Sequence, residues 1–250
     1  MKKNAFLLVL FMTLISCGRG YHELPFGGMN GKVEKVTEYH IMPGIWFAGF
    51  KGTDVMYMNA TAYDIDGNEI CSAVMDSIGR IQAEAENFFE NDVCVRSTQR
   101  AGGRTLAQIN FKERKGNELV YDKIAGSQII RMIVKETSFM RIFKSIVSED
   151  GDKKLKNVIR INRHGYPVSV DVYDLKAATS SHEKNTYDEN NNLIEKCIVR
   201  KDAAGEETLE IVYSQYVEFD EQGNWTEACT YNKNKLPVEV IRREIEYWHQ

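Results

Sequence analysis

The residues able to do catalytic or metal-binding chemistry are spread thinly along this 250-residue chain. Five histidines occur singly, in neither the HExxH pattern nor another ligand spacing: His22, His40, His164, His182 and His249. Besides Cys17, four cysteines lie 23, 103 and 32 residues apart and fit neither a CxxC motif nor a zinc pattern: Cys71, Cys94, Cys197 and Cys229. The sequence also lacks a GxSxG elbow. We therefore expect no enzyme activity, no metal and no cofactor.

One segment has carboxylates spaced as in a calcium-binding loop, because Asp64 and Asp66 alternate before Gly67. An EF-hand loop needs a bidentate Glu eleven residues after its first Asp, and Met75 occupies that position. Similar turns rich in Gly and Asn recur later in the chain, where a turn needs no metal. We interpret the segment as a hairpin turn.

The N-terminal segment has the parts of an export signal. Met1 to Asn4 is short and positively charged, and Ala5 to Ile15 is an apolar run broken only by Thr13. This run is shorter than the roughly 20 apolar residues of a transmembrane helix and matches the h-region of a secretory signal. We predict that residues 1–16 are a signal peptide.

The end of this signal, Leu14-Ile15-Ser16-Cys17, resembles the lipobox of bacterial lipoproteins. The resemblance implies that Cys17 is acylated and becomes the new N-terminus. Several acyl chains hold a protein stably on a membrane, because each buried methylene contributes about 0.8 kcal/mol. We expect residues 17–30 to form a lipid-anchored tether and residues 31–250 to form a single β-hairpin-repeat domain.

The residues after Cys17 bear on the location of the protein. Neither an aspartate nor an acidic tract follows directly, and such residues often act as sorting signals in lipoproteins. The resemblance therefore favours the outer membrane with the protein facing the periplasm, and exposure at the cell surface stays open. Loss of Lys2 and Lys3 takes the formal net charge from −4 to −6, with no basic patch for nucleic acid. The expected partners are the membrane, through Cys17, and an envelope protein or glycan.

A short unit recurs from residue 31 onward: an aromatic residue, a carboxylate, a turn rich in Gly and Asn, and an alternating strand. Alignment of the clearest copies places three residues at one turn position: Gly67, Asn191 and Gly223. Several neighbouring copies lie 12 residues apart, which is a strand-plus-turn period and too short for helical repeats. The predicted fold is all-β, an antiparallel meander of β-hairpin repeats that forms an extended or curled twisted sheet.

The motifs that start at Tyr63-Asp64, Tyr187-Asp188 and Phe219-Asp220 resemble the YD-type hairpin repeats, related to those of RHS proteins, of many uncharacterised envelope lipoproteins. The resemblance covers most of residues 31–248 and implies architecture, because hairpin repeats serve as scaffolds in unrelated proteins. Residues 83–110 and 120–145 fit the repeat poorly, and we expect irregular or partly helical structure there. Residues 82–91 are rich in helix formers but alternate as a strand does, so we expect a strand within them.

Even offsets from the turn residues place Cys71, Cys197 and Cys229 on one strand face. That face would also carry Ile81, Ala83 and Ala85 after the turn at Gly79, which predicts buried, core-filling thiols. Disulfides remain the alternative, because the envelope permits them.

One aromatic segment differs from the repeats: it is apolar without alternation and contains Trp46, Phe47 and Phe50. We weigh two interpretations, a loop that packs over the end of the sheet and an exposed binding loop for a glycan or a partner protein. If the chain has a binding site that sequence can indicate, it is this candidate loop.

These patterns favour a lipid-anchored cell-envelope protein with a binding or scaffolding role and an unknown ligand. Two alternatives remain: an enzyme acting on envelope polymer through a dispersed site, and an accessory or immunity-type lipoprotein. A deep cleft with paired carboxylates would favour the enzyme.

Overall fold

The computed structural model describes residues 24–44, 54–91, 93–137, 142–149, 152–174 and 177–249. A short 3-10 helix, η1 (Pro25–Gly28), precedes the strands. The strands are β1 (Val33–Ile41), β2 (Val55–Tyr63), β3 (Glu69–Asp76), β4 (Ile81–Glu90), β5 (Val93–Ala101), β6 (Arg104–Lys115), β7 (Glu118–Ala125), β8 (Gln128–Thr137), β9 (Ile142–Glu149), β10 (Asp152–Ile161), β11 (Pro167–Asp174), β12 (Thr179–Tyr187), β13 (Leu193–Lys201), β14 (Glu207–Phe219), β15 (Trp225–Asn232) and β16 (Pro237–Tyr247).

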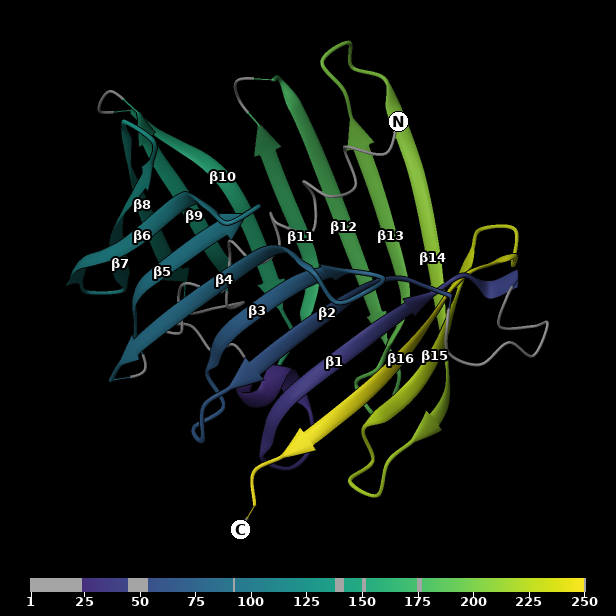
Figure 1. Ribbon diagram of the computed structural model, residues 1–250. Coiled ribbons are helices and arrows are strands. Elements are labelled where there is room, and N and C mark those ends of the chain that lie inside the picture. The colour runs from purple at the N-terminus through teal and green to yellow at the C-terminus, as the bar shows by residue number, and fades with distance from the viewer. Residues whose placement is uncertain are drawn as a thin grey trace.

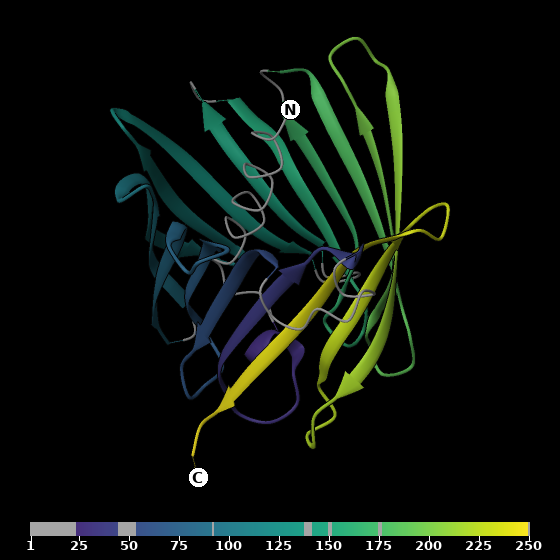
Figure 2. The same cartoon turned by 45° about the vertical axis from the view of Figure 1, so that its right-hand side comes forward.

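Each strand pairs antiparallel with its neighbours in sequence, and β1 also pairs with β16, so the sheet closes into a barrel (Figure 1). The closing pair runs from Val33 opposite Tyr247 to Ile41 opposite Val240. Figure 2 shows two facing walls, with β1 and β16 on one side and β11 to β14 on the other. The predicted all-β antiparallel meander is confirmed, and its curl continues to complete closure.

Seven of the described hairpin turns share one hydrogen-bond scheme built on an Asp or Asn side chain. In the β2–β3 turn, Oδ1 of Asp64 accepts two backbone N–H groups at 3.0 and 2.8 Å. The scheme recurs at six further residues: Asp76, Asn162, Asp188, Asp202, Asp220 and Asn232. The predicted turn residues Gly67, Asn191 and Gly223 have φ angles of +82°, +63° and +80°, as this kind of turn requires. Turn formation accounts for the carboxylate of Asp64.

The turns lie at the two ends of the barrel. We call one the strap end; it carries the turns at residues 64–68, 162–166, 188–192 and 220–224. We call the other the far end; it carries the turns at residues 76–80, 202–206 and 232–236. Residues 24–30, which include η1, lie at the strap end and are called the strap.

The strap identifies which face of the sheet is the interior. Phe26 packs with Val36 of β1 and Tyr63 of β2, which belong to one wall of the barrel. The hydroxyl of Tyr166, at the β10–β11 turn on the opposite wall, donates a 3.2 Å hydrogen bond to the carbonyl of Gly28. Because the strap touches both walls, the face that bears Val36 points into the barrel. Side-chain alternation and the strand registers extend this assignment around the ring.

The predicted shared face of the cysteines and alanines is wrong for the alanines. Cys71 pairs with Glu86, whereas Ala85 pairs with Ser72, so Cys71 and Ala85 point to opposite faces. Successive hairpins of a meander turn in opposite senses, so identical turns at the two ends present equivalent residues to opposite faces. Cys71 follows a strap-end turn, and Ala85 follows a far-end turn. Ile81 is 55% exposed and is not a core residue.

Among the described residues, the largest apolar cluster lies in the interior of β4 to β8. Its buried members, Cys94, Ile109, Leu119 and Tyr121, are packed against partly buried side chains of β4, β6 and β8. A second cluster lies beneath the strap, and a third lies on the outer side of the closing strands around Ile41, Cys229 and Val240. The expectation of irregular or helical structure in residues 83–110 and 120–145 is therefore wrong across the described strands β4 to β8.

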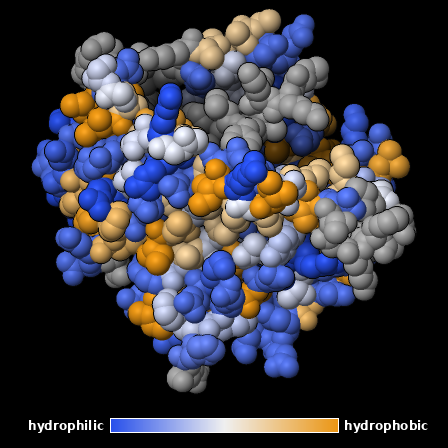
Figure 3. All heavy atoms as spheres, in the orientation of Figure 1, coloured by the Kyte–Doolittle hydropathy of each residue, from blue (hydrophilic) through white to orange (hydrophobic). Residues whose placement is uncertain are grey.

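The outer face carries ion pairs between neighbouring strands at many points of the ring. The pairs are Lys35–Glu246, Arg100–Glu84, Arg131–Asp122, Arg160–Asp171 and Arg242–Glu227. Figure 3 shows hydrophilic side chains spread over the face formed by β1 to β4 and β16, with apolar ones scattered between them. Among the described residues, no helix has the length and apolar character needed to cross a membrane.

Candidate functional site

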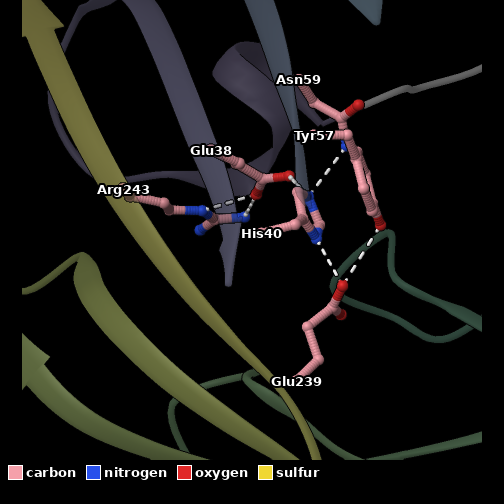
Figure 4. Close-up of polar contacts among 6 residues, drawn as sticks. All are labelled: Glu38, His40, Tyr57, Asn59, Glu239 and Arg243. Carbon is pink, nitrogen blue, oxygen red and sulfur yellow. Dashed lines mark hydrogen bonds and ion pairs between the residues drawn. The ribbon is translucent and has the colours of Figure 1, made fainter. Parts of the chain in front are cut away.

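A group of polar and ionisable side chains lies on the inner face where the barrel closes (Figure 4). Three adjacent strands, β1, β2 and β16, supply its members: Glu38, His40, Tyr57, Asn59, Glu239 and Arg243. Alternation puts the members of each strand on one face, and the registers of β1 with β2 and β16 bring the three strands' side chains together. We call this group the seam cluster.

His40 is the centre of the seam cluster. Its Nδ1 lies 2.9 Å from Oε1 of Glu239, and its Nε2 lies 3.7 Å from Oε2 of Glu38. The imidazole also stacks on the ring of Tyr57, with centroids 4.1 Å apart and planes at 12°. The hydroxyl of Tyr57 donates to the same Glu239 oxygen at 3.3 Å, so this carboxylate joins all three strands.

His40 is held as an imidazolium. Burial lowers the pKa of a histidine, but hydrogen bonds and attraction to Glu239 and Glu38 outweigh burial and raise the pKa of His40 to about 9. An imidazolium donates from both ring nitrogens. The neighbouring amide fits this state, because Oδ1 of Asn59 is buried without a partner while its nitrogen lies 3.0 Å from Nε2. A half-turn of the amide lets Oδ1 accept the Nε2–H that an imidazolium donates.

Arg243 neutralises the second carboxylate of the cluster. Its Nη2 lies 2.7 Å from Oε1 of Glu38, and its guanidinium lies 3.4 Å above the ring of Trp225. Burial alone would raise the pKa of Glu38, but Arg243 and then His40 outweigh burial and lower that pKa to about 2. Glu38 is therefore ionised over the whole physiological range.

The arrangement balances its own charge. Two carboxylates face one guanidinium and one imidazolium, and the side chains of these four groups are between 7% and 23% exposed. A protonated His40 cannot accept a proton, and both ring nitrogens already have partners. In the described part of the chain, no three or more His, Cys, Asp or Glu residues are grouped to hold a metal ion. The seam cluster is suited to joining β1, β2 and β16 electrostatically.

A second candidate is an open hollow of about 410 Å³ on the outer side of β13 to β15. It is lined by Ile194, Tyr213, Ser214, Gln215, Tyr231 and Lys235. The hydroxyl of Tyr231 donates to Oε1 of Gln215 at 3.2 Å, and the ammonium of Lys235 lies 3.2 Å from the ring centre of Tyr213. We call this hollow the outer groove. Its aromatic faces and amide and ammonium groups are the kinds of group that bind polar ligands.

The site residues proposed from the sequence lie outside the described residues. Cys17, the acylation site, and the candidate loop residues Trp46, Phe47 and Phe50 remain predictions. The four cysteines at 71, 94, 197 and 229 are described and are free thiols. The free thiols agree with the preferred interpretation and not with a disulfide framework. The predicted burial holds for Cys229, which is 2% exposed. It is wrong for Cys71 and Cys197, which lie on the outer face of the sheet and are only partly buried.

Sequence reasoning missed the seam cluster because its members lie about 200 residues apart along the chain. In the sequence His40 stands apart from the other histidines, and the cluster members Glu239 and Arg243 come from the last strand. A signal was present, since Glu38 and His40 alternate on one strand, as do Glu239 and Arg243 on another. Only the register of the closing pair shows that these alternating charges meet.

Comparisons with known proteins identify no family. No family model matches the chain, and no curated protein matches it. Among solved structures, the chain is similar to a porin-like protein from Bacteroides uniformis, with 8% sequence identity and a TM-score of 0.27. That similarity covers 87% of this chain and 99% of the other. The resemblance to YD-type repeats therefore stays a prediction.

Proposed function

We propose that the protein is a lipid-anchored, non-catalytic protein of the bacterial cell envelope, with a binding or scaffolding role. The observation that carries the non-catalytic part of this proposal is the self-compensated seam cluster. Catalysis by acid and base needs a group free to exchange a proton near neutral pH. In the seam cluster, Glu38 is held ionised and His40 is held protonated by partners already in place.

The ion pairs on the outer face support the proposal that the barrel stands in water and is attached to the membrane through Cys17. A barrel that crosses a membrane presents an apolar band about 25 Å tall to the lipid. Here the outward side chains of neighbouring strands form ion pairs, as between Arg160 and Asp171 at 2.7 Å. Burying such pairs in lipid would be costly. Attachment through the acylated residue that the lipobox resemblance implies avoids this cost.

The intact mass of the native mature protein tests the anchor. We expect an N-terminus at Cys17 that carries acyl chains, and we expect the Cys17→Ala protein to keep residues 1–16. Cys71→Ser is the matched control and should be processed and acylated normally. A mature, unacylated wild-type protein would refute the lipid anchor.

Photocrosslinking in the native envelope tests the binding role. A photoreactive residue at Gln215, inside the outer groove, should capture a discrete partner. The same residue at Lys35, which lies on the outer face of β1 at the closing pair, is the control and should capture less. Equal or absent capture at the two positions would contradict a binding surface at the outer groove.

A further inference from the structure

The strap joins the start of the described chain to three separate turns of the strap end. The backbone N–H of Phe26 donates to the carbonyl of Gly67 at 3.0 Å, in the β2–β3 turn. The backbone N–H of Asn30 donates to Oδ1 of Asn224 at 2.7 Å, in the β14–β15 turn, and the amide of Asn224 donates back at 2.9 Å. These contacts add to the hydrogen bond from Tyr166 to the strap.

The contacts leave little room for the strap to shift. A Cβ built on Gly67 would lie 2.9 Å from the backbone nitrogen of Phe26, so this turn and the strap approach as closely as a glycine allows. A Cβ built on Gly165 would lie 2.7 Å from the side chain of Leu24, on the opposite wall. The strap is thus held from both sides of the ring, through Phe26 at the β2–β3 turn and through Leu24 at the β10–β11 turn.

The length of chain between the anchor and the strap is short. Only residues 18–23 separate Cys17 from Leu24. Fully extended, these seven steps span at most about 25 Å. The far end lies one strand length from the strap, which is roughly 30 Å for a strand of nine residues such as β13. The anchor therefore reaches the membrane most directly from the strap end.

Resting on the lipid anchor proposed above, we propose that the strap end of the barrel faces the bilayer and that the far end points away from it. The strap acts as the positioning element, since it couples the tether to turns on both walls. The occupant of the strap-end surface is the headgroup layer of the lipid in which the Cys17 acyl chains are embedded.

Exposed apolar residues occur at both ends of the barrel, so an orientation with the far end toward the bilayer is the alternative that an experiment must exclude. Apolar side chains are exposed near both ends, for example Phe219 at the strap end (49%) and Ile78 at the far end (68%). Surface hydrophobicity therefore does not select an end. The strap and the short tether do.

Energy transfer from a donor dye to acceptor-labelled lipid headgroups tests the orientation, using the full-length acylated protein in phosphatidylethanolamine and phosphatidylglycerol vesicles. Donors are attached at matched turn positions, each two residues after the Asp or Asn that organises its turn. Asn190→Cys and Ala204→Cys flank β13, and Gln222→Cys and Asn234→Cys flank β15. The partly exposed native thiols at Cys71 and Cys197 are replaced by serine.

We expect a larger loss of donor fluorescence from Asn190→Cys than from Ala204→Cys, and from Gln222→Cys than from Asn234→Cys. Adding Asn224→Ala, which removes both hydrogen bonds to Asn30, should shrink the difference within each pair. Vesicle-bound protein with equal or reversed transfer would overturn the orientation. Protein that does not bind vesicles, with no transfer from any position, would instead show that the lipid anchor itself is wrong.

Discussion

His40 on the first strand and Glu239 on the last strand lie 2.9 Å apart, Nδ1 to Oε1, across the pair that closes the barrel. The two residues are 199 positions apart in the sequence. The bond therefore forms only when the whole ring is assembled, and its charge state should influence how stable the closed sheet is.

Stability should fall as the pH rises through the alkaline range. The pKa of His40 is raised to about 9 in the folded state, against 6.5 when unfolded. The stabilisation is therefore fully present below about pH 6.5 and is lost by about pH 9, and it amounts to about 3 kcal/mol. Urea unfolding of wild type and His40→Gln at several pH values measures it. The gap between the two proteins should close toward pH 9.

A control isolates this effect from other groups that titrate at high pH. His182→Gln removes a histidine whose side chain is 52% exposed. This variant leaves the seam cluster intact and should keep the stabilisation that His40 provides below pH 9. If His40→Gln and His182→Gln behaved alike, the imidazolium would not stabilise the closing pair.

Arg243→Met should destabilise the fold by about 2 to 4 kcal/mol, because it leaves the carboxylate of Glu38 partly buried without its partner. The double variant Glu38→Gln with Arg243→Met should lose less than the sum of the single losses. Chemical denaturation of the four proteins gives the coupling energy. Additive losses would show that Arg243 and Glu38 act independently.

Gly67→Ala should cost more stability than Gly116→Ala. Both glycines have positive φ angles, so each substitution strains the backbone by about 1 kcal/mol or more. At Gly67 the added Cβ also meets the backbone of Phe26, whereas at Gly116 it meets nothing within 4 Å. Thermal melts compare the two directly. Equal losses would mean that the strap does not press on the β2–β3 turn.

The four cysteines should differ in their reactivity toward a thiol reagent. Cys94 and Cys229 are 0% and 2% exposed and should react only after unfolding. Cys71 and Cys197 are partly exposed and should react in the folded protein. Burial and nearby carboxylates raise the pKa of the Cys71 thiol, which slows its reaction relative to a free thiol. Mass spectrometry without reduction should find four alkylatable thiols, and fast native labelling of Cys94 would contradict the structure.

Local signals predicted the turns and the strand class, because a hairpin turn is built from residues close in sequence. The Gly- and Asn-rich composition of the turns is enough to predict that Gly67 and Asn191 occupy turn positions with positive φ angles. The faces of the strands were harder, because bulges such as the one at Ile70 change the alternation and alternate hairpins turn in opposite senses. Closure could not be predicted, since the pairing of β1 with β16 has no local signal. The seam cluster was missed for the same reason.

The most direct test of the account replaces residues 1–17 by a cleavable signal peptide without a lipobox cysteine and follows the exported protein by cell fractionation. A barrel that stands in water and is held only through Cys17 should appear in the soluble periplasmic fraction, folded without detergent, with a β-rich circular dichroism spectrum. Retention in the membrane after alkaline extraction, or folding only in detergent, would contradict the account and place the barrel in the lipid.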